Sequence, residues 1–86
     1  MNDLEKSIKA LANRRRLAIA RLLKKSSDLT VGELAENIKL SFKSTSRHLS
    51  VLYAAEIIGR DQKGLEMHYY LHKIQKPGAK EIISIL

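Results

Sequence analysis

Apolar side chains recur at helical spacing through the first two thirds of the chain and predict helices there. The first helix carries Leu4, Ile8 and Leu11 on one face and should end near residues 12–13. Asn13 is expected to cap a second helix, because its short side chain can accept from the free N–H groups of a first helical turn. The buried stripe of that second helix should comprise Leu17, Ile19, Ala20 and Leu23.

A short turn separates a third and a fourth predicted helix. Thr30 and Glu33 form a capping box for the third, and Ser41 caps the fourth, which should run to about Glu56. Small or apolar residues three to five positions apart mark the inward face: Leu34, Ala35, Ile38, Leu40, Thr45, Leu49 and Leu52. The outward side chains of the fourth helix are Lys43, Ser44, Ser46, Arg47 and Ser50. A helix that presents only small polar and basic side chains suits the major groove of DNA.

The pattern changes to β-branched and aromatic residues in segments 57–62 and 67–72, which predict a β-hairpin. The turn falls at residues 63–66, with Gly64 supplying the positive φ. Met67, Tyr69 and Leu71 should face the core, which leaves the alternate side chains facing out: His68, Tyr70 and His72. The two histidines lie about 13 Å apart along the strand, too far to share a metal ion.

Pro77 and Gly78 break the chain before a last helix over residues 79–86. That helix ends in Ile82, Ile83, Ile85 and Leu86, which need cover from the rest of the domain or from a second subunit. The predicted fold class is therefore mainly α with a small β-hairpin, in the order α-α-α-α-β-β-α, a winged helix-turn-helix. We expect the terminal helices to form a dimer interface through Leu4, Ile8, Leu11, Ile82, Ile83 and Leu86.

The composition predicts one small domain over residues 1–86, with 44% hydrophobic and 29% charged residues. No apolar run reaches the roughly 18–20 residues that span a bilayer, so we expect no membrane segment. The first residues lack the basic and apolar regions of a secretory leader, which leads us to expect a cytoplasmic protein. Without cysteine there are no disulfides, thiol chemistry or thiolate metal ligands.

The charge balance favours a polyanionic partner. Sixteen basic against nine acidic residues give a net charge of +7 and a pI near 9.9, which fits nucleic acid or simple solubility. The placement of the cations on the fourth helix favours DNA, because Arg47 can donate to guanine O6 and N7 and Lys43 can reach a base or a phosphate. Ser44, Ser46 and Ser50 can bond phosphate oxygens. Which of these side chains reads the base sequence stays open.

Two neighbours on the fourth helix have alternative roles. His48 is either a further DNA contact or a partly exposed side chain packed beside the helix. Phe42 could stack on a sugar or a thymine methyl group, although core or staple packing is favoured. In the hairpin, Arg60 and Lys63 flank the tip and could reach phosphates or the minor groove, unless the hairpin is an ordinary charged surface.

Three arginines at residues 14–16 follow the cap of the second helix directly. Cations are unfavourable there, because the N-terminus of a helix is already partly positive. This suggests a contact with the DNA backbone or with carboxylates, while a structural role is the alternative for Arg16.

Four segments, in order and at matching spacing, resemble the ArsR-type winged helix-turn-helix regulators. They are ALANRRRLAIARLL (residues 10–23), VGELA (31–35), LSFKSTSRHLSVL (40–52) and GLEMHYYL (64–71). The resemblance covers nearly the whole chain and implies a homodimer whose recognition helices, here about residues 41–56, enter successive major grooves about 34–36 Å apart. The wing at about residues 57–72 would contact the backbone or the minor groove.

The chain departs from that family at its sensor sites. Members that sense soft metals use cysteines in the third helix, and others bind ions through histidines on a long last helix; this chain has neither. We therefore expect no metal site and no cofactor, and a small-molecule effector remains open. Phe42 replaces a glutamine common in the family, and Lys39 replaces a glycine. A lysine at positive φ costs on the order of 1 kcal/mol, so a differently shaped turn is expected there.

These observations predict a sequence-specific, DNA-binding transcriptional regulator, with repression the expected mode. The partners would be double-stranded DNA and a second copy of the chain. The alternative is a winged helix that docks another protein through its apolar C-terminus. An enzyme is excluded, because the sequence has no nucleophile–base–acid set, no glycine-rich phosphate loop and no metal cluster.

Overall fold

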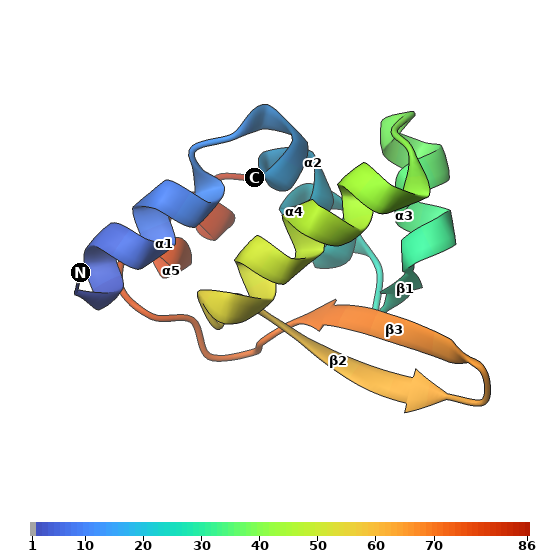
Figure 1. Cartoon of the computed structure of the whole chain (residues 1–86). Helices are drawn as coiled ribbons and strands as arrows, with labels where there is room; N and C mark the ends of the chain where they lie inside the picture. Colours follow the sequence, from blue (N-terminus) through green and yellow to red (C-terminus); the bar gives the residue numbers. More distant parts are fainter. Residues whose placement is uncertain (1) are drawn as a thin grey trace.

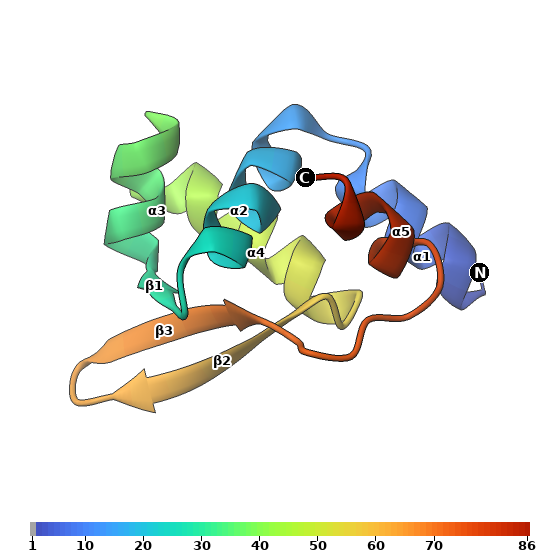
Figure 2. The ribbon, with the colours of Figure 1, turned by 180° about the vertical axis from the view of Figure 1, so that it is seen from behind.

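The computed structural model describes residues 2–86 and confirms the predicted fold class, with one further short strand (Figure 1). The elements in chain order are α1 (Asp3–Leu11), α2 (Arg14–Lys25), β1 (Leu29–Thr30), α3 (Val31–Ile38), α4 (Phe42–Ala54), β2 (Ile58–Lys63), β3 (Glu66–Leu71) and α5 (Ala79–Ser84). Helix α4 crosses in front of α2, with α1 and α5 together at one end and α3 at the other. The view from behind shows α5 lying against α1 (Figure 2).

The predicted caps at the starts of three helices are confirmed. The Asn13 carboxamide accepts from the backbone N–H groups of Arg15 and Arg16 at the start of α2. Thr30 and Glu33 bond each other's backbone N–H at the start of α3, and the Ser41 hydroxyl accepts from Ser44 N–H at the start of α4. These bonds satisfy donors that a helix cannot satisfy itself, so they fix where α2, α3 and α4 begin.

Both helices of the helix-turn-helix end in a left-handed residue that is not glycine. At the end of α3, Lys39 has φ 55° and Leu40 N–H bonds Ala35 O. At the end of α4, Glu56 has φ 61° and Ile57 N–H bonds Leu52 O. This is the Schellman pattern, which normally uses glycine. The expectation of a differently shaped turn at Lys39 is therefore wrong, and α4 ends at Ala54, two residues earlier than predicted.

Glycine at position 39 should stabilise the protein. Lys39→Gly removes the steric cost of the left-handed conformation, which is on the order of 1 kcal/mol. Part of this gain in stability is offset, because glycine gives the unfolded chain more conformational freedom. We expect a net gain of about 0.5 kcal/mol in the free energy of unfolding, measured by urea denaturation. Lys25→Gly, in the last turn of α2, is the matched control and should destabilise. A loss of stability in Lys39→Gly would contradict this account of the turn.

The sheet has three strands in the order β1-β3-β2, all antiparallel. Strands β2 and β3 form the predicted hairpin with a turn tighter than expected, since Lys63 pairs with Glu66 and only Gly64, at φ 63°, and Leu65 lie between them. Strand β1 was not predicted, because two residues are too short to show an alternating pattern. It pairs Leu29 with Tyr69.

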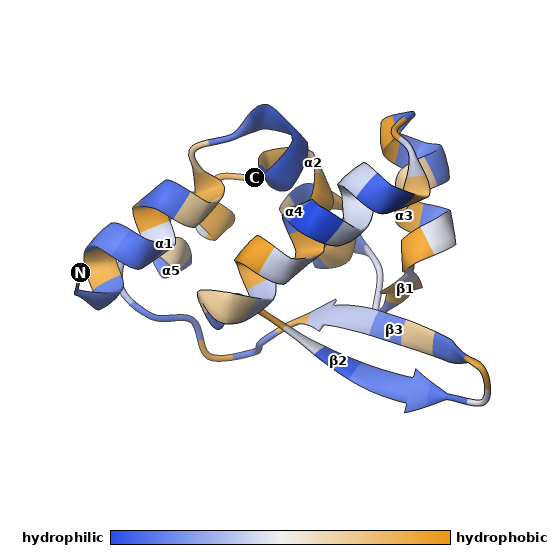
Figure 3. Cartoon of the chain, viewed as in Figure 1, coloured by the Kyte–Doolittle hydropathy of each residue, from blue (hydrophilic) through white to orange (hydrophobic). Residues whose placement is uncertain are grey.

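The core lies between α2, α4 and the sheet. Its fully buried side chains include Ile19 of α2, Leu34 of α3 and Leu49 and Leu52 of α4. Tyr69 faces this core as predicted, and Met67 and Leu71 pack against its edge. The predicted outward direction of the alternate side chains is only partly right, because His68, Tyr70 and His72 are half-buried. Hydrophobic segments recur along the helices, while β2 is hydrophilic from Arg60 to Lys63, the end that leads to the tip of the wing (Figure 3).

Candidate nucleic-acid interface

The outer face of α4 carries the cations proposed from the sequence. Lys43 and Arg47 lie one helical turn apart and are exposed, and neither side chain has a hydrogen bond or ion pair within residues 2–86. Ser50 is also exposed and bonds Ser46 O through its hydroxyl (3.0 Å), while Ser44 and Ser46 are half-exposed. The face therefore offers two free cations among short hydroxyls, on a regular helix.

The inner face of α4 holds this surface in place. Thr45 is fully buried, and its hydroxyl donates to Ser41 O at 2.8 Å. Leu49 and Leu52, one and two turns further on, are also completely buried. A helix anchored by buried side chains along its length presents its outer face rigidly, which favours recognition of a fixed surface such as a base-pair edge.

His48 lies on the flank of α4 that faces α1 and α2. It is half-buried, and its Nδ1 is 3.2 Å from the Arg16 guanidinium. Because arginine only donates, Nδ1 is the acceptor and the proton of the neutral ring lies on Nε2. Burial, together with the charges of Arg16 and Arg15, lowers the pKa of His48 below its usual value. His48 therefore packs beside the helix against Arg16, and the DNA contact that the sequence also allows stays a prediction.

The lowered pKa of His48 predicts a loss of stability in mild acid. The unfolded chain takes up a proton below pH 6.5, the ordinary value for histidine, whereas the folded chain takes it up only at lower pH. The contribution of His48 is thus fully present above pH 6.5 and is lost as the pH falls through the lower folded pKa. Urea unfolding of wild type and His48→Gln between pH 7.5 and 5.5 should show a shallower pH dependence in the variant. Equal slopes would contradict the assignment.

Two of the three arginines at the start of α2 stabilise the ends of other helices. Arg15 donates to Ile38 O, the last carbonyl of α3, at 2.8 Å. Arg16 donates to Ala10 O and Lys9 O near the end of α1. A guanidinium at these carbonyls satisfies free acceptors and complements the negative end of each helix dipole. Within residues 2–86, Arg15 and Arg16 contact backbone carbonyls and no carboxylate, as the structural alternative for Arg16 predicted. Arg14 is exposed, and a contact of these arginines with the DNA backbone stays a prediction.

Phe42 is not packed as the favoured interpretation predicted. As the first residue of α4 its side chain is 64% exposed, at the edge of a hollow between α3, α4 and the wing. Leu65, at the tip of the wing, borders the same hollow and is fully exposed.

The two wing cations have different surroundings. Arg60 lies three residue pairs from the turn, so it does not flank the tip as predicted, and its guanidinium stacks 4.1 Å from the centre of the Tyr53 ring on α4. Lys63 does adjoin the tip, where its Nζ is 2.8 Å from Asp28. Asp28 also contacts His68 Nδ1 at 2.8 Å, and the hydrogen bonds from Lys63 and His68 lower the Asp28 pKa. The contact of Arg60 with Tyr53 attaches the wing to α4, and the contact of Lys63 with Asp28 attaches it to the loop after α2.

The residues predicted for a dimer interface separate into two groups. Leu11 is 1% exposed and Ile83 is also buried, because both side chains fill the core of the chain itself, so neither offers surface to a second copy. Leu4 and Ile8 on α1 are 47% and 46% exposed. Ile82 and Leu86 are half-buried, while the neighbouring Ile85 is 83% exposed. We call the exposed and half-exposed group the apolar face of α1 and α5: Leu4, Ile8, Ile82, Ile85 and Leu86.

Residues 2–86 contain no group of three metal-ligating side chains and no helix long and apolar enough to cross a membrane. The arrangement of α3, the tight turn and α4, followed by the β2–β3 hairpin, defines a DNA-binding protein of the winged helix-turn-helix class. The chain belongs to the ArsR family of bacterial regulatory proteins, whose model matches residues 13–59, from the cap of α2 to the start of β2.

Relatives of known name agree with this assignment. The chain is 39% identical over 64 residues to the transcriptional repressor SdpR of Bacillus subtilis. The matched region covers 74% of this chain and 70% of SdpR. The structure of reduced HlyU from Vibrio cholerae superposes with a TM-score of 0.83 at 30% identity, over 98% of this chain and 84% of HlyU. A homodimeric winged helix-turn-helix domain, Mb0332 of Mycobacterium bovis, shares the fold with a TM-score of 0.79 at 22% identity. The superposition covers 96% of this chain and 70% of the Mb0332 domain. The predicted regulator, as opposed to an enzyme, is confirmed by the family.

Proposed function

We propose that this chain binds DNA as a homodimer, with α4 of each copy in the major groove and the β2–β3 wing against the backbone or minor groove. The outer face of α4 carries the proposal, because Lys43 and Arg47 are exposed there and bond no other side chain of residues 2–86. Arg47 can donate to guanine O6 and N7, and Lys43 can reach a base or a phosphate. Ser44, Ser46 and Ser50 are short enough to let the helix backbone approach the phosphates.

The wing adds a second, weaker contact. Lys63 stands at its tip, and Arg60 lies along β2 against Tyr53 of α4. Their exposed charges fit phosphate oxygens, which position a protein on the duplex without reading its sequence. In this arrangement His48 acts through Arg16, as a packing contact that sets the angle of α4 against α1 and α2.

A second copy of the chain is the proposed cover for the apolar face of α1 and α5. The exposed Leu4, Ile8 and Ile85 lie on two helices that pack side by side at one end of the molecule (Figures 1 and 2). Apolar surface that recurs on adjacent helices marks an interaction site. The homodimeric Mb0332 domain, with the same fold, supports a dimer. A two-fold axis there would set the two α4 helices on an inverted repeat, about one turn of DNA apart.

Repression is the proposed outcome of binding. The relationship to the transcriptional repressor SdpR supports this mode. In the proposed arrangement, the dimer bound to an inverted repeat would occupy a promoter.

Fluorescence anisotropy of a labelled duplex from the region upstream of the chain's own gene tests the proposal. A scrambled duplex of equal length is the control, and both are titrated across a range of salt. We expect preference for the natural duplex and a log–log salt slope of roughly −4, from two phosphate contacts on each of two chains at about −0.9 each. Equal binding to both duplexes would replace sequence-specific regulation by nonspecific binding. No binding at low salt would favour the alternative, a winged helix that docks another protein.

A further inference from the structure

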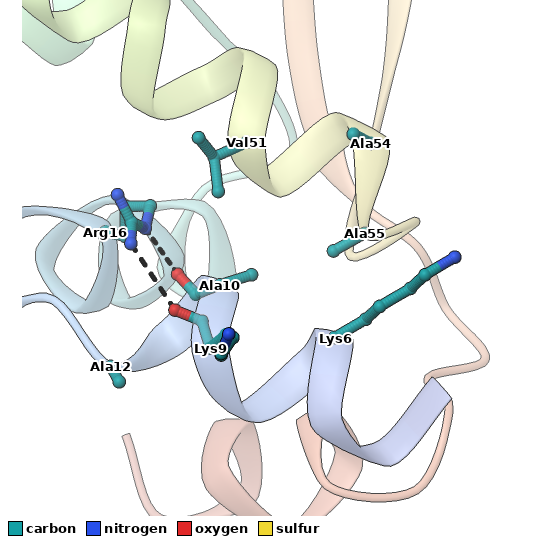
Figure 4. A pocket seen from close by; sticks show the side chains of 8 residues that line it. All are labelled: Lys6, Lys9, Ala10, Ala12, Arg16, Val51, Ala54 and Ala55. Carbon is teal, nitrogen blue, oxygen red and sulfur yellow. Dashed lines mark hydrogen bonds between the residues drawn. The ribbon is translucent and has the colours of Figure 1, made fainter. Parts of the chain in front are cut away.

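A groove of about 620 Å³ runs between α1 and α4, a size typical of small-molecule sites (Figure 4). Its apolar surface comes from Ala10 of α1, from Val51 and Ala54 of α4, and from Ala55. The alanines leave space that larger side chains at the same helical positions would fill. Val51, in the last turn of the recognition helix, is exposed although it is apolar, so α4 has an apolar flank that the proposed DNA contacts do not explain.

The groove is separate from the dimer surface of the proposed function and borders its DNA-binding surface. At 100° per residue, Val51 and Ala55 project from the flank of α4 that faces α1. Ala54 projects from the outer face with Lys43 and Arg47, so the groove meets that face at Ala54. On α1, Lys6 and Lys9 lie on the flank opposite Leu4 and Ile8, which belong to the apolar face of α1 and α5. A ligand in the groove would therefore contact the recognition helix without displacing a second copy of the chain.

The charged residues that line the groove are all cations, and the nearest carboxylate that interacts with them is Glu56, beside Lys6 and outside the lining. Lys6 and Lys9 stand at its edge, exposed and without a hydrogen bond or ion pair within residues 2–86, and Arg16 adds a third cation at the inner end. No carboxylate lines the space. Figure 4 shows Arg16 held by the carbonyls of Ala10 and Lys9, while Lys6 extends freely past Ala55. An apolar floor with a cationic edge is complementary to a molecule with an alkyl body and one anionic group.

We propose that the α1–α4 groove binds a linear alkyl carboxylate, with the alkyl chain along Val51 and the alanines and the carboxylate at Lys6 and Lys9. Arg16 connects this site to DNA binding, because the same guanidinium bonds His48 on α4. An alkyl chain bound between α1 and α4 changes the position of the recognition helix. The negative charge of the ligand's carboxylate weakens the attraction of the protein for DNA phosphates. The ligand therefore lowers DNA affinity, and by linkage DNA lowers ligand affinity by the same factor. This second step rests on the proposed function; the site itself does not.

Titration of the full chain with decanoate, without DNA, tests the site. Calorimetry should give one saturable site per chain, and the shifted amide signals in ¹H–¹⁵N spectra should be those of residues 6–10 and 51–55. Decylammonium, with the same chain and the opposite charge, and acetate, with the same head group and no chain, should not saturate. Equal binding of decylammonium, or shifts confined to residues 4 and 8 and to α5, would overturn the assignment.

Variants locate the two parts of the ligand. Lys6→Gln and Lys9→Gln should each weaken decanoate binding about fivefold, the effect of removing one exposed charge pair. Ala54→Leu fills the groove with a strong helix former and should abolish binding, and a thermal melt checks that this variant folds. Lys25→Gln on α2 removes an equal charge elsewhere and should bind as wild type does. Unchanged binding in both Lys6→Gln and Ala54→Leu would overturn the proposal.

The effect on DNA is measured separately by anisotropy with and without decanoate. A decrease in DNA affinity that disappears in Ala54→Leu supports the coupling, and an unchanged affinity with the site saturated overturns it. If decanoate binds but no duplex does, the proposed function fails and the site stands. If the duplex binds but decanoate does not, the site fails and the proposed function stands.

Discussion

Arg47→Ala is expected to weaken binding of the dimer to its natural duplex by about 30-fold or more. A bidentate arginine–guanine pair contributes about 1–3 kcal/mol, and a homodimer loses it at both half-sites, so the minimum is about 2 kcal/mol in total. The structure supports a direct loss, because Arg47 is exposed and bonds no other side chain of residues 2–86, so its removal leaves the fold unchanged. Fluorescence anisotropy at fixed salt gives the affinity, and the unfolding free energy should stay within about 0.5 kcal/mol of wild type.

Lys43→Ala separates base reading from charge. If Lys43 contacts a phosphate, its loss should weaken natural and scrambled duplexes alike and make the salt slope shallower by about one for each copy. Arg21→Ala removes an exposed arginine of α2 instead, is the matched control for lost charge, and should bind within about twofold of wild type. An Arg47→Ala protein that still prefers the natural duplex by the wild-type ratio would refute base reading by this residue.

Ile8→Glu is expected to convert the dimer to a monomer and to weaken binding to the full inverted repeat about 100-fold or more. The side chain is 46% exposed on the apolar face of α1 and α5, so the substitution is tolerated in a free chain but places a charge in the dimer interface. Loss of the second copy removes the gain from two linked half-sites, on the order of 10²–10⁴ in affinity. Light scattering after size exclusion gives the mass, and anisotropy on full and half-site duplexes gives the two affinities.

The half-site duplex provides the internal check, because a monomer with an intact α4 should bind it as one wild-type copy does. Asn37→Glu adds the same charge on α3, away from the apolar face of α1 and α5, and should remain dimeric. An Ile8→Glu protein that stays dimeric at tens of micromolar would remove α1 from the interface. A wild-type chain that is monomeric under those conditions would remove the dimer from the proposal altogether.

The fold could be predicted from the sequence because its signals are local and agree with one another. Asn13, Thr30 with Glu33, and Ser41 each mark a helix start by one short-range bond, and the inward stripe of α3 and α4 follows from helical spacing. The hairpin follows from alternation around Gly64. Strand β1 was missed because its two residues become a strand only by pairing with β3, a long-range contact without a local signal.

The sequence correctly predicted the placement of those candidate DNA-binding residues for which exposure to solvent was the only structural requirement. Lys43, Arg47 and Ser50 project from α4 as helical spacing requires. The surroundings of Arg15, Arg16, Arg60 and Lys63 were not predictable, because their partners lie 6 to 35 residues away in the sequence. Leu11 shows the same limit, since an apolar helical stripe does not tell the protein's own core from a second subunit. Cations that look free in a sequence can be committed to helix ends, a ring or a carboxylate once the chain folds.

The left-handed residues Lys39 and Glu56 stand just before and just after the recognition helix, and both hold a conformation that glycine would adopt at lower cost. Replacing either residue by glycine would therefore increase the free energy of unfolding without changing the surface of α4 that contacts DNA. Changes on that surface that retarget it to another sequence usually destabilise, and a glycine at either end could offset them without altering a DNA contact. Directed evolution of operator preference would then be expected to recruit positions 39 and 56 repeatedly, alongside whichever residues of α4 acquire new base contacts.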